Sequence, residues 1–222
     1  PERMPDTLLS LDRSNKLRIP FVQGRFNMGG TGVLAFCGRQ HLQLLLSRRN
    51  PTVLNGRLAH PSDDQWGFTV VRREDPEGGR RSSVYTYLAP VGSKKAPRAG
   101  GVLRFSSDTM PIFPEGRNPY CQASPHGTLI KLFEYTASGY SNAHMLMKRG
   151  LLARLDLLLP DPALPIRLHE CRREYRGHEG SFETTLTGVT VRLDDDKGEN
   201  LEDGFPASCP ISVDGEPMTL TI

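Results

Sequence analysis

The sequence predicts an α+β fold, a two-layer sandwich in which helices cover one face of a mostly antiparallel sheet. Three observations support this prediction. Several short segments rich in β-branched, aromatic and leucine residues are bounded by polar turns, as strands are. Other segments repeat apolar residues at helical spacing. The chain of 222 residues, 37% of them hydrophobic, is long enough to bury a core of its own.

Helices are predicted where apolar residues recur at helical spacing or a helix stop follows a short apolar run. Gly38 marks such a stop, and Pro160 follows the last of these segments. The predicted helices cover residues 4–17, 33–37 and 141–159.

Strands are predicted for seven apolar or alternating segments: 42–47, 66–71, 83–88, 128–135, 166–170, 184–193 and 218–222. The polar connection 74–79 predicts that the second and third of these strands form a hairpin. Residues 90–125 are rich in Gly, Pro and Ser and are expected to form a long irregular loop. A polar turn is expected at 194–200.

Composition excludes several classes of protein. The 28 basic and 25 acidic residues leave a net charge of +3, which does not indicate a nucleic-acid-binding protein. No apolar run reaches the roughly 18–20 residues of a membrane span, and no signal-peptide pattern opens the chain. The 4 cysteines show no zinc-ligand spacing, so we expect free thiols in a cytoplasmic protein. Both ends look cut, and we expect the chain to be a piece of a longer protein.

The strongest functional signal is Gly24-Arg-Phe-Asn-Met-Gly-Gly-Thr-Gly32, which runs into a predicted helix. Glycines let a backbone approach a ligand closely, and amides in the first turn of a helix favour an anion such as phosphate. The alternative is a simple turn. The stretch differs from a P-loop because Gly30 stands where that motif has its lysine.

This glycine-rich stretch resembles the second glycine box of the GHKL ATPases, the superfamily of gyrase B, the ninety-kilodalton heat-shock chaperone, histidine kinases and MutL. Gly24, Phe26 and Gly29 match the chaperone form G-x-F-G-x-G, whereas Asn27 replaces a glycine. A second resemblance is His126-Gly-Thr-Leu-Ile-Lys-Leu, which is similar to the Gly-Thr motif that begins a central strand in these ATPases. The order of the predicted elements, a short helix, three strands, the Gly-Thr strand and a helix, also resembles the MutL-type ATPase domain, and the resemblance covers about residues 5–158.

The resemblance implies an ATP-binding domain of the Bergerat type over residues 1–160, with the remainder of the sheet or a second domain over 161–222. It implies ATP and Mg²⁺ as ligands, a lid at 5–30 that closes on the nucleotide, and a nucleotide-dependent homodimer. The implied binding residues are Lys16, Gly24, Phe26, Asn27, Met28, Gly29, Gly30, Thr31, Gly32 and Thr128. The family's catalytic glutamate, its magnesium-binding asparagine and its D-x-G-x-G box have no match in residues 1–23, so no catalytic residue is assigned within this chain.

Other interpretations remain open. A non-catalytic, nucleotide-gated interaction module, acting in DNA maintenance or phage defence, would keep the glycine loop but lack turnover. An arginine- and lysine-rich cluster could contact DNA phosphates, although acidic neighbours dilute it and a solvated loop is the default: Arg72, Arg73, Arg80, Arg81, Lys94, Lys95 and Arg98. Ser141 lies in a near match to a hydrolase elbow but also suits a helix N-cap. His169 and His178 do not have the spacing of a helical metal site.

Overall fold

The computed structural model describes residues 1–11, 29–54, 62–91, 101–111, 123–136, 151–159, 166–170, 174–175, 178–179, 182–189, 191, 202–205 and 207–222. The chain divides into two units, Pro1–Ala137 and Ser138–Ile222. Every strand pairing within the described residues is antiparallel. The predicted mostly antiparallel sheet is therefore confirmed, whereas the described residues contain few and short helices.

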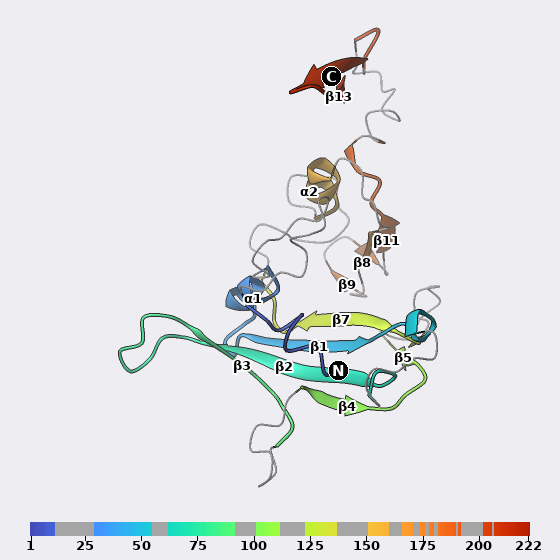
Figure 1. Ribbon diagram of the computed structural model, residues 1–222. Helices are drawn as coiled ribbons and strands as arrows, with labels where there is room; N and C mark the ends of the chain where they lie inside the picture. The colour runs from blue at the N-terminus through green and yellow to red at the C-terminus, as the bar shows by residue number, and fades with distance from the viewer. Residues whose placement is uncertain are drawn as a thin grey trace. The chain divides into compact units, whose positions relative to one another are not determined.

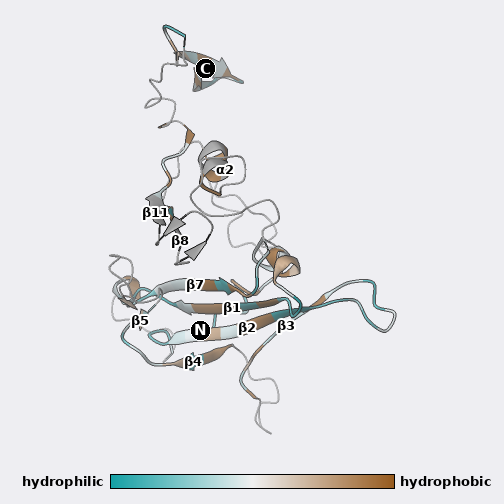
Figure 2. Cartoon of the chain, turned by 180° about the vertical axis from the view of Figure 1, so that it is seen from behind, coloured by the Kyte–Doolittle hydropathy of each residue, from teal (hydrophilic) through white to brown (hydrophobic). Residues whose placement is uncertain are grey.

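The first unit is built on a five-stranded sheet in the order β3-β2-β1-β7, with β4 also paired to β2 (Figure 1). Its strands are β1 (Leu42–Arg48), β2 (Trp66–Glu74), β3 (Val84–Tyr87), β4 (Leu103–Phe105) and β7 (Gly127–Leu132). The β2–β3 hairpin and the strand at β7 confirm the predictions for these segments. β1 itself is largely hydrophobic, while the connection between β2 and β3 is hydrophilic (Figure 2).

The register of β1 fixes which residues share each face of the sheet. Gln43, Leu45 and Ser47 stand opposite Leu132, Ile130 and Thr128 of β7. On the other side of β1, Gln43 and Leu45 stand opposite Val71 and Thr69 of β2. Since directly opposed residues point to the same side of a sheet, these side chains share one face, which we call the cavity face.

The cavity face is covered by two segments that precede β1. One is residues 1–11, and the other comprises α1 (Gly29–Gly32) and the 3-10 helix η1 (Val33–Phe36). A cluster of buried side chains from these segments and from the sheet forms the core: Met4, Leu34, Cys37, Leu45, Val71 and Val102. The helical structure predicted over 33–37 is confirmed by η1, whose C-cap is Cys37. Gly38 follows with a φ of 52° and ends the helix as predicted.

The helix predicted over residues 4–17 is wrong for its described part, because residues 1–11 form successive turns. The backbone N–H groups of Met4, Asp6 and Thr7 donate to carbonyls three residues earlier, as turns do, rather than four residues earlier as in an α-helix. The Thr7 hydroxyl also donates to the Arg3 carbonyl at 2.7 Å, which offers that carbonyl a partner outside a helical ladder. Burial of Met4 and Leu9 against the core stabilises this non-helical path.

The long loop predicted for 90–125 contains three short strands within its described residues. β4 pairs with β2, and β5 (Met110–Pro111) pairs with β6 (Ala123–Ser124). Phe68 and Phe105 meet edge to face across β2 and β4, with ring centroids 5.7 Å apart. Strands of two or three residues in a Gly- and Pro-rich stretch are held by such cross-strand contacts rather than by their own propensity.

The described residues of the second unit include the α-helix α2 and several two-stranded ladders. The helix α2 (Leu151–Leu158) confirms the end of the helix predicted over 141–159. The remaining elements are β8 (Arg167–Glu170) paired with β11 (Phe182–Thr185), β9 (Glu174–Tyr175) with β10 (His178–Glu179), and β12 (Ser208–Val213) with β13 (Glu216–Thr221). The strand predicted for 184–193 is confirmed only at Thr184 and Thr185, the end of β11; beyond it residues 186–188 lie outside any strand, and Val189 and Val191 are helical. The predicted domain boundary near residue 160 stays a prediction.

The β12–β13 hairpin has two distinct faces. Asp214 and Gly215 form its turn with φ values of 50° and 86°, as a two-residue type I′ turn requires. One face carries exposed apolar side chains: Cys209, Ile211, Val213, Met218 and Leu220. The other face carries serines, threonines and prolines.

No helix in the described part of the chain has the length and apolar character needed to cross a membrane.

Candidate functional site

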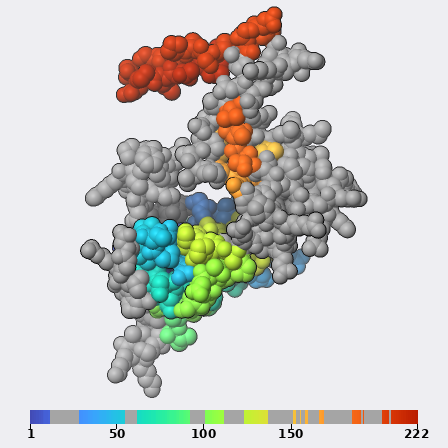
Figure 3. All heavy atoms as spheres, turned by 90° about the vertical axis from the view of Figure 1, so that its right-hand side faces the viewer, coloured from blue at the N-terminus to red at the C-terminus, as the bar shows by residue number. Residues whose placement is uncertain are grey.

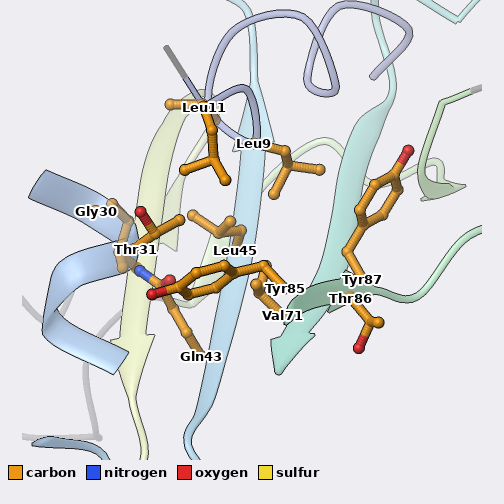
Figure 4. A pocket seen from close by; sticks show the side chains of 12 residues that line it. Leu9, Leu11, Gly30, Thr31, Gln43, Leu45, Val71, Tyr85, Thr86 and Tyr87 are labelled. Atoms are coloured by element: carbon orange, nitrogen blue, oxygen red, sulfur yellow. The ribbon is translucent and has the colours of Figure 1, made fainter. Parts of the chain in front are cut away.

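A cavity of about 350 Å³ opens on the cavity face of the sheet. Its walls come from the N-terminal turns, from α1 and from four strands: Leu8, Leu9, Leu11, Gly30, Thr31, Gln43, Leu45, Val71, Tyr85, Thr86, Tyr87 and Ile130 (Figure 4). The lining is mostly apolar, and its polar groups are few. This combination is typical of a small-molecule site.

The predicted glycine-rich site is described only in part. Gly29, Gly30, Thr31 and Gly32 form α1, and Gly30 and Thr31 line the cavity. Lys16, Gly24, Phe26, Asn27 and Met28 lie outside the described residues.

The glycines of α1 are not required by protein packing. A Cβ built on Gly29, Gly30 or Gly32 would meet no atom within 4 Å, and none of the three has a positive φ. Neither crowding nor backbone strain therefore explains them. They leave open backbone beside the cavity.

Thr128, the other predicted site residue, lies at the start of β7 on the cavity face. Its Oγ1 lies 2.8 Å from Oγ of Ser47, so the two hydroxyls share a hydrogen bond. Thr128 is exposed, and Ile130, two residues along the same face, lines the cavity. The structure thus brings the β7 strand and the glycine helix to one cavity, although they are far apart in the sequence.

Arg48 forms hydrogen bonds with several loops at the end of the sheet where Thr128 lies. Its Nε donates to the Asp64 carbonyl at 2.6 Å, and its Nη1 donates at 3.0 Å to the carbonyls of Ser107, Asp108 and Pro125. Trp66, buried beside them, donates from Nε1 to the same Ser107 carbonyl at 3.1 Å. Segments near residues 50, 105 and 125 form a continuous surface here (Figure 3). Arg48 therefore positions the chain that leads into Gly127 and Thr128.

Sequence reasoning missed the role of Gln43. It is only 2% exposed and lines the cavity between apolar neighbours. Its sequence signal is a single polar residue in the apolar run Leu42-Gln-Leu-Leu-Leu, which predicts a strand but not which side chains point into a cavity.

Cys37 carries a buried thiol in the core, between the cavity face and the segments that cover it. It is 1% exposed, and its Sγ lies 3.4 Å from the Val33 carbonyl. Burial raises the pKa of the Cys37 thiol, because the thiolate would lose its hydration. Cys209, in contrast, is exposed.

At the other predicted sites, the residues that the structure describes do not form a binding site. Arg73 pairs with Asp75 at 2.8 Å, and Arg80 donates to the Glu77 carbonyl, so part of the basic cluster is engaged within its own hairpin. Lys94, Lys95, Arg98 and Ser141 lie outside the described residues. His169 and His178 belong to two different ladders, and the described part of the chain contains no group of three His, Cys, Asp or Glu residues placed to hold a metal.

No family model, curated protein or solved structure matches the chain. Function must therefore be inferred from the site itself.

Proposed function

We propose that this chain is the nucleotide-binding part of a GHKL-type ATPase with a Bergerat-type fold, and that ATP binds on the cavity face. One observation supports this most directly. The glycine helix and the Gly-Thr strand, the two segments that resemble this superfamily, border the same cavity on one face of an antiparallel sheet. Segments so distant in sequence need not have met there.

The positions of the two motifs support different roles, with Thr128 near the adenine and the glycines near the phosphates. Thr128 offers a hydroxyl at the sheet end of the face and is already fixed by Ser47, so it can contribute to the adenine side of the site. Gly29, Gly30 and Gly32 leave open backbone in α1, beside the cavity, where phosphates could approach closely. Because α1 has only four residues, the phosphate contacts are assigned to the whole stretch Gly24 to Gly32.

The N-terminal turns support the proposed lid. Leu8, Leu9 and Leu11 belong to the segment 5–30 and line the cavity. Leu8 and Leu11 are 38% and 41% exposed, so further closure over a ligand would bury more apolar area. In this proposal nucleotide binding is converted into a change in the position of this segment.

The size of the cavity fits a small organic ligand, since such sites usually measure about 300–1,000 Å³. Magnesium finds no matching set of carboxylates or imidazoles among the described residues, so no step is assigned to it. Hydrolysis needs a general base that activates water. No residue of this chain is proposed for that role.

Calorimetric titration of the full chain with ATP tests the proposal. We expect binding to the wild type, and roughly fivefold weaker binding to Thr128→Val, because one hydrogen bond is worth about 1 kcal/mol. Thr219→Val, on the exposed hairpin of the second unit, is the matched control and should bind as the wild type does. Absence of ATP binding to the wild type would contradict the proposal.

A second candidate is the non-catalytic, nucleotide-gated interaction module, with a second copy of the chain as its partner. The exposed apolar face of the β12–β13 hairpin favours it, because a lone two-stranded hairpin is marginally stable until such a face is covered. Pro210 and Pro217 stand opposite Thr219 and Ser212, at positions where their nitrogens face outward, so each edge lacks a donor for another strand. ATP-dependent dimerisation of the intact protein without phosphate release, followed by light scattering, would favour this function over an ATPase.

A further inference from the structure

Gln43 carries a buried side-chain amide on the floor of the cavity. The residue is 2% exposed, yet among the residues that the structure describes none forms a hydrogen bond with this amide. Buried polar groups in native proteins are nearly always hydrogen-bonded, because an unpaired one loses its hydration without compensation. The amide therefore calls for a partner that enters the cavity.

The surroundings of Gln43 restrict what that partner can be. Leu45 and Val71 lie beside Gln43 on the cavity face, and Leu9 covers the same cavity. In Figure 4 the side chains of Gln43 and Tyr85 extend from the sheet toward α1. A group bound here thus meets aliphatic side chains and an aromatic ring, with the Gln43 amide and the hydroxyl-bearing residues Thr31 and Tyr85 as its polar neighbours, which suits a flat heteroaromatic ring.

A glutamine amide offers a donor and an acceptor side by side in one plane. Its best partner presents an acceptor and a donor with the same spacing, and the pairing of Gln with the N6 amino group and a ring nitrogen of adenine is the common example. A purely aliphatic ligand would leave the amide unpaired. A carboxylate offers acceptors only and would satisfy just half of it.

We infer that Gln43 is the specificity-determining residue of this cavity and that it pairs with the edge of a planar heteroaromatic ring of the aminopurine class. This inference rests on the proposed function and deepens it, because it assigns recognition of the base to a residue other than Thr128. Gln43 and Thr128 lie on the same face, Gln43 on β1 and Thr128 on β7. Of the two, only Gln43 lines the cavity, whereas the register places Thr128 four residues further along the face, opposite Ser47.

The test replaces the amide by a side chain of similar length and shape, Gln43→Met, in the full chain. The matched control is Gln40→Met, the same change at an exposed glutamine near the start of β1. Adenosine is the probe, because it carries the base without phosphates. We expect adenosine to bind the wild type and Gln40→Met equally, and to bind Gln43→Met roughly ten- to a hundredfold more weakly.

A second measurement separates recognition from a purely structural role. Without ligand, Gln43→Met removes an unpaired buried amide, so we expect its Tm to rise by about 2–4 °C while its affinity for adenosine falls. A structural hydrogen bond of Gln43 within the protein would give the opposite result, a lower Tm. That outcome overturns the inference.

The inference and the proposed function fail in different ways. If adenosine binds the wild type and Gln43→Met equally, or binds neither, the inference is wrong, while ATP binding that depends on Thr128 would still support the proposed function. If adenosine binding depends on Gln43 but ATP binds no more tightly than adenosine, the base site stands and the phosphate site of the proposed function does not.

Discussion

Ser47 and Thr128 stand directly opposite each other on β1 and β7, and their hydroxyl oxygens lie 2.8 Å apart. This pair joins the central strand of the first unit to the strand that begins with the Gly-Thr motif. The hydrogen bond favours one of the χ1 rotamers that the exposed Thr128 side chain could otherwise adopt.

A double-mutant cycle measures this relationship. We expect Ser47→Ala and Thr128→Val each to destabilise the chain by less than about 1 kcal/mol in urea unfolding, with a coupling of roughly 0.5–1 kcal/mol between them. If the proposed function is right, Ser47→Ala should also weaken ATP binding, though less than Thr128→Val does. Additive effects on stability would show that the hydroxyl pair does not act as a unit.

Substitution of the glycines beside the cavity separates stability from binding. Gly30→Ala adds a methyl group to a helical residue, and this group would have no neighbour within 4 Å. We therefore expect the free energy of unfolding to rise by up to about 1 kcal/mol. The same methyl group occupies open backbone at the proposed phosphate flank, so ATP affinity should fall. A more stable variant with unchanged ATP affinity would remove Gly30 from the site.

Gly38→Ala should instead destabilise the protein. Gly38 has a φ of 52°, and a Cβ there would lie 2.7 Å from Cβ of Glu134 and overlap its carboxylate. Backbone strain and steric overlap together should lower the free energy of unfolding by roughly 1–3 kcal/mol, as measured by urea unfolding. Gly79→Ala is the control, since Gly79 also has a positive φ, 84°, but no neighbour within 4 Å, and it should lose less.

Arg48→Lys should destabilise the first unit although it keeps the charge. The guanidinium reaches four backbone carbonyls from two nitrogens, and a single ammonium cannot match that geometry. We expect a loss of roughly 1.5–3 kcal/mol and reduced protection of the amide of Thr128 in hydrogen exchange. The neighbouring Arg49, half exposed and 3.7 Å from Asp63, provides the control, because Arg49→Lys should cost less than about 1 kcal/mol.

The two described cysteines should differ in reactivity and in their effect on stability. In a background with Cys121 and Cys171 replaced by serine, a maleimide should label Cys209 rapidly and Cys37 only on unfolding. The raised pKa of Cys37 means that above about pH 8.5 the unfolded chain releases this proton while the folded chain retains it. The stabilisation by the protonated thiol is full below that pH and is lost as the pH rises, and Cys37→Ala should flatten this decline.

The sequence predicted those elements whose signal is local. The segments 42–47, 66–71 and 83–88 carry runs of strand-forming residues, and β1, β2 and β3 occupy them. The helix predicted over 4–17 is wrong for residues 4–11, because the spacing of apolar residues does not reveal that backbone N–H groups there bond three residues back, in turns. Asp214-Gly215, a strong turn signal between alternating residues, was overlooked, and with it β12.

The candidate site was only half predictable for a physical reason. Gly30, Thr31 and Thr128 were found through motifs, which are short stretches of sequence. Gln43 belongs to no motif, and its strand carries leucines on both faces, so alternation did not reveal a polar residue on a buried face. Only the register, with Val71 and Leu132 opposite Gln43, places its amide in the cavity.

The position of β1 has a consequence for the nascent chain. β1 and β2 are consecutive strands and can pair as soon as both are synthesised, but the other edge of β1 pairs with β7, which follows β3 and β4 in the sequence. During that interval a leucine-rich strand edge, Leu42–Arg48, is open to the strands of other chains. Fast translation through residues 75–126 should therefore favour soluble yield, and clusters of rare codons placed there should lower it.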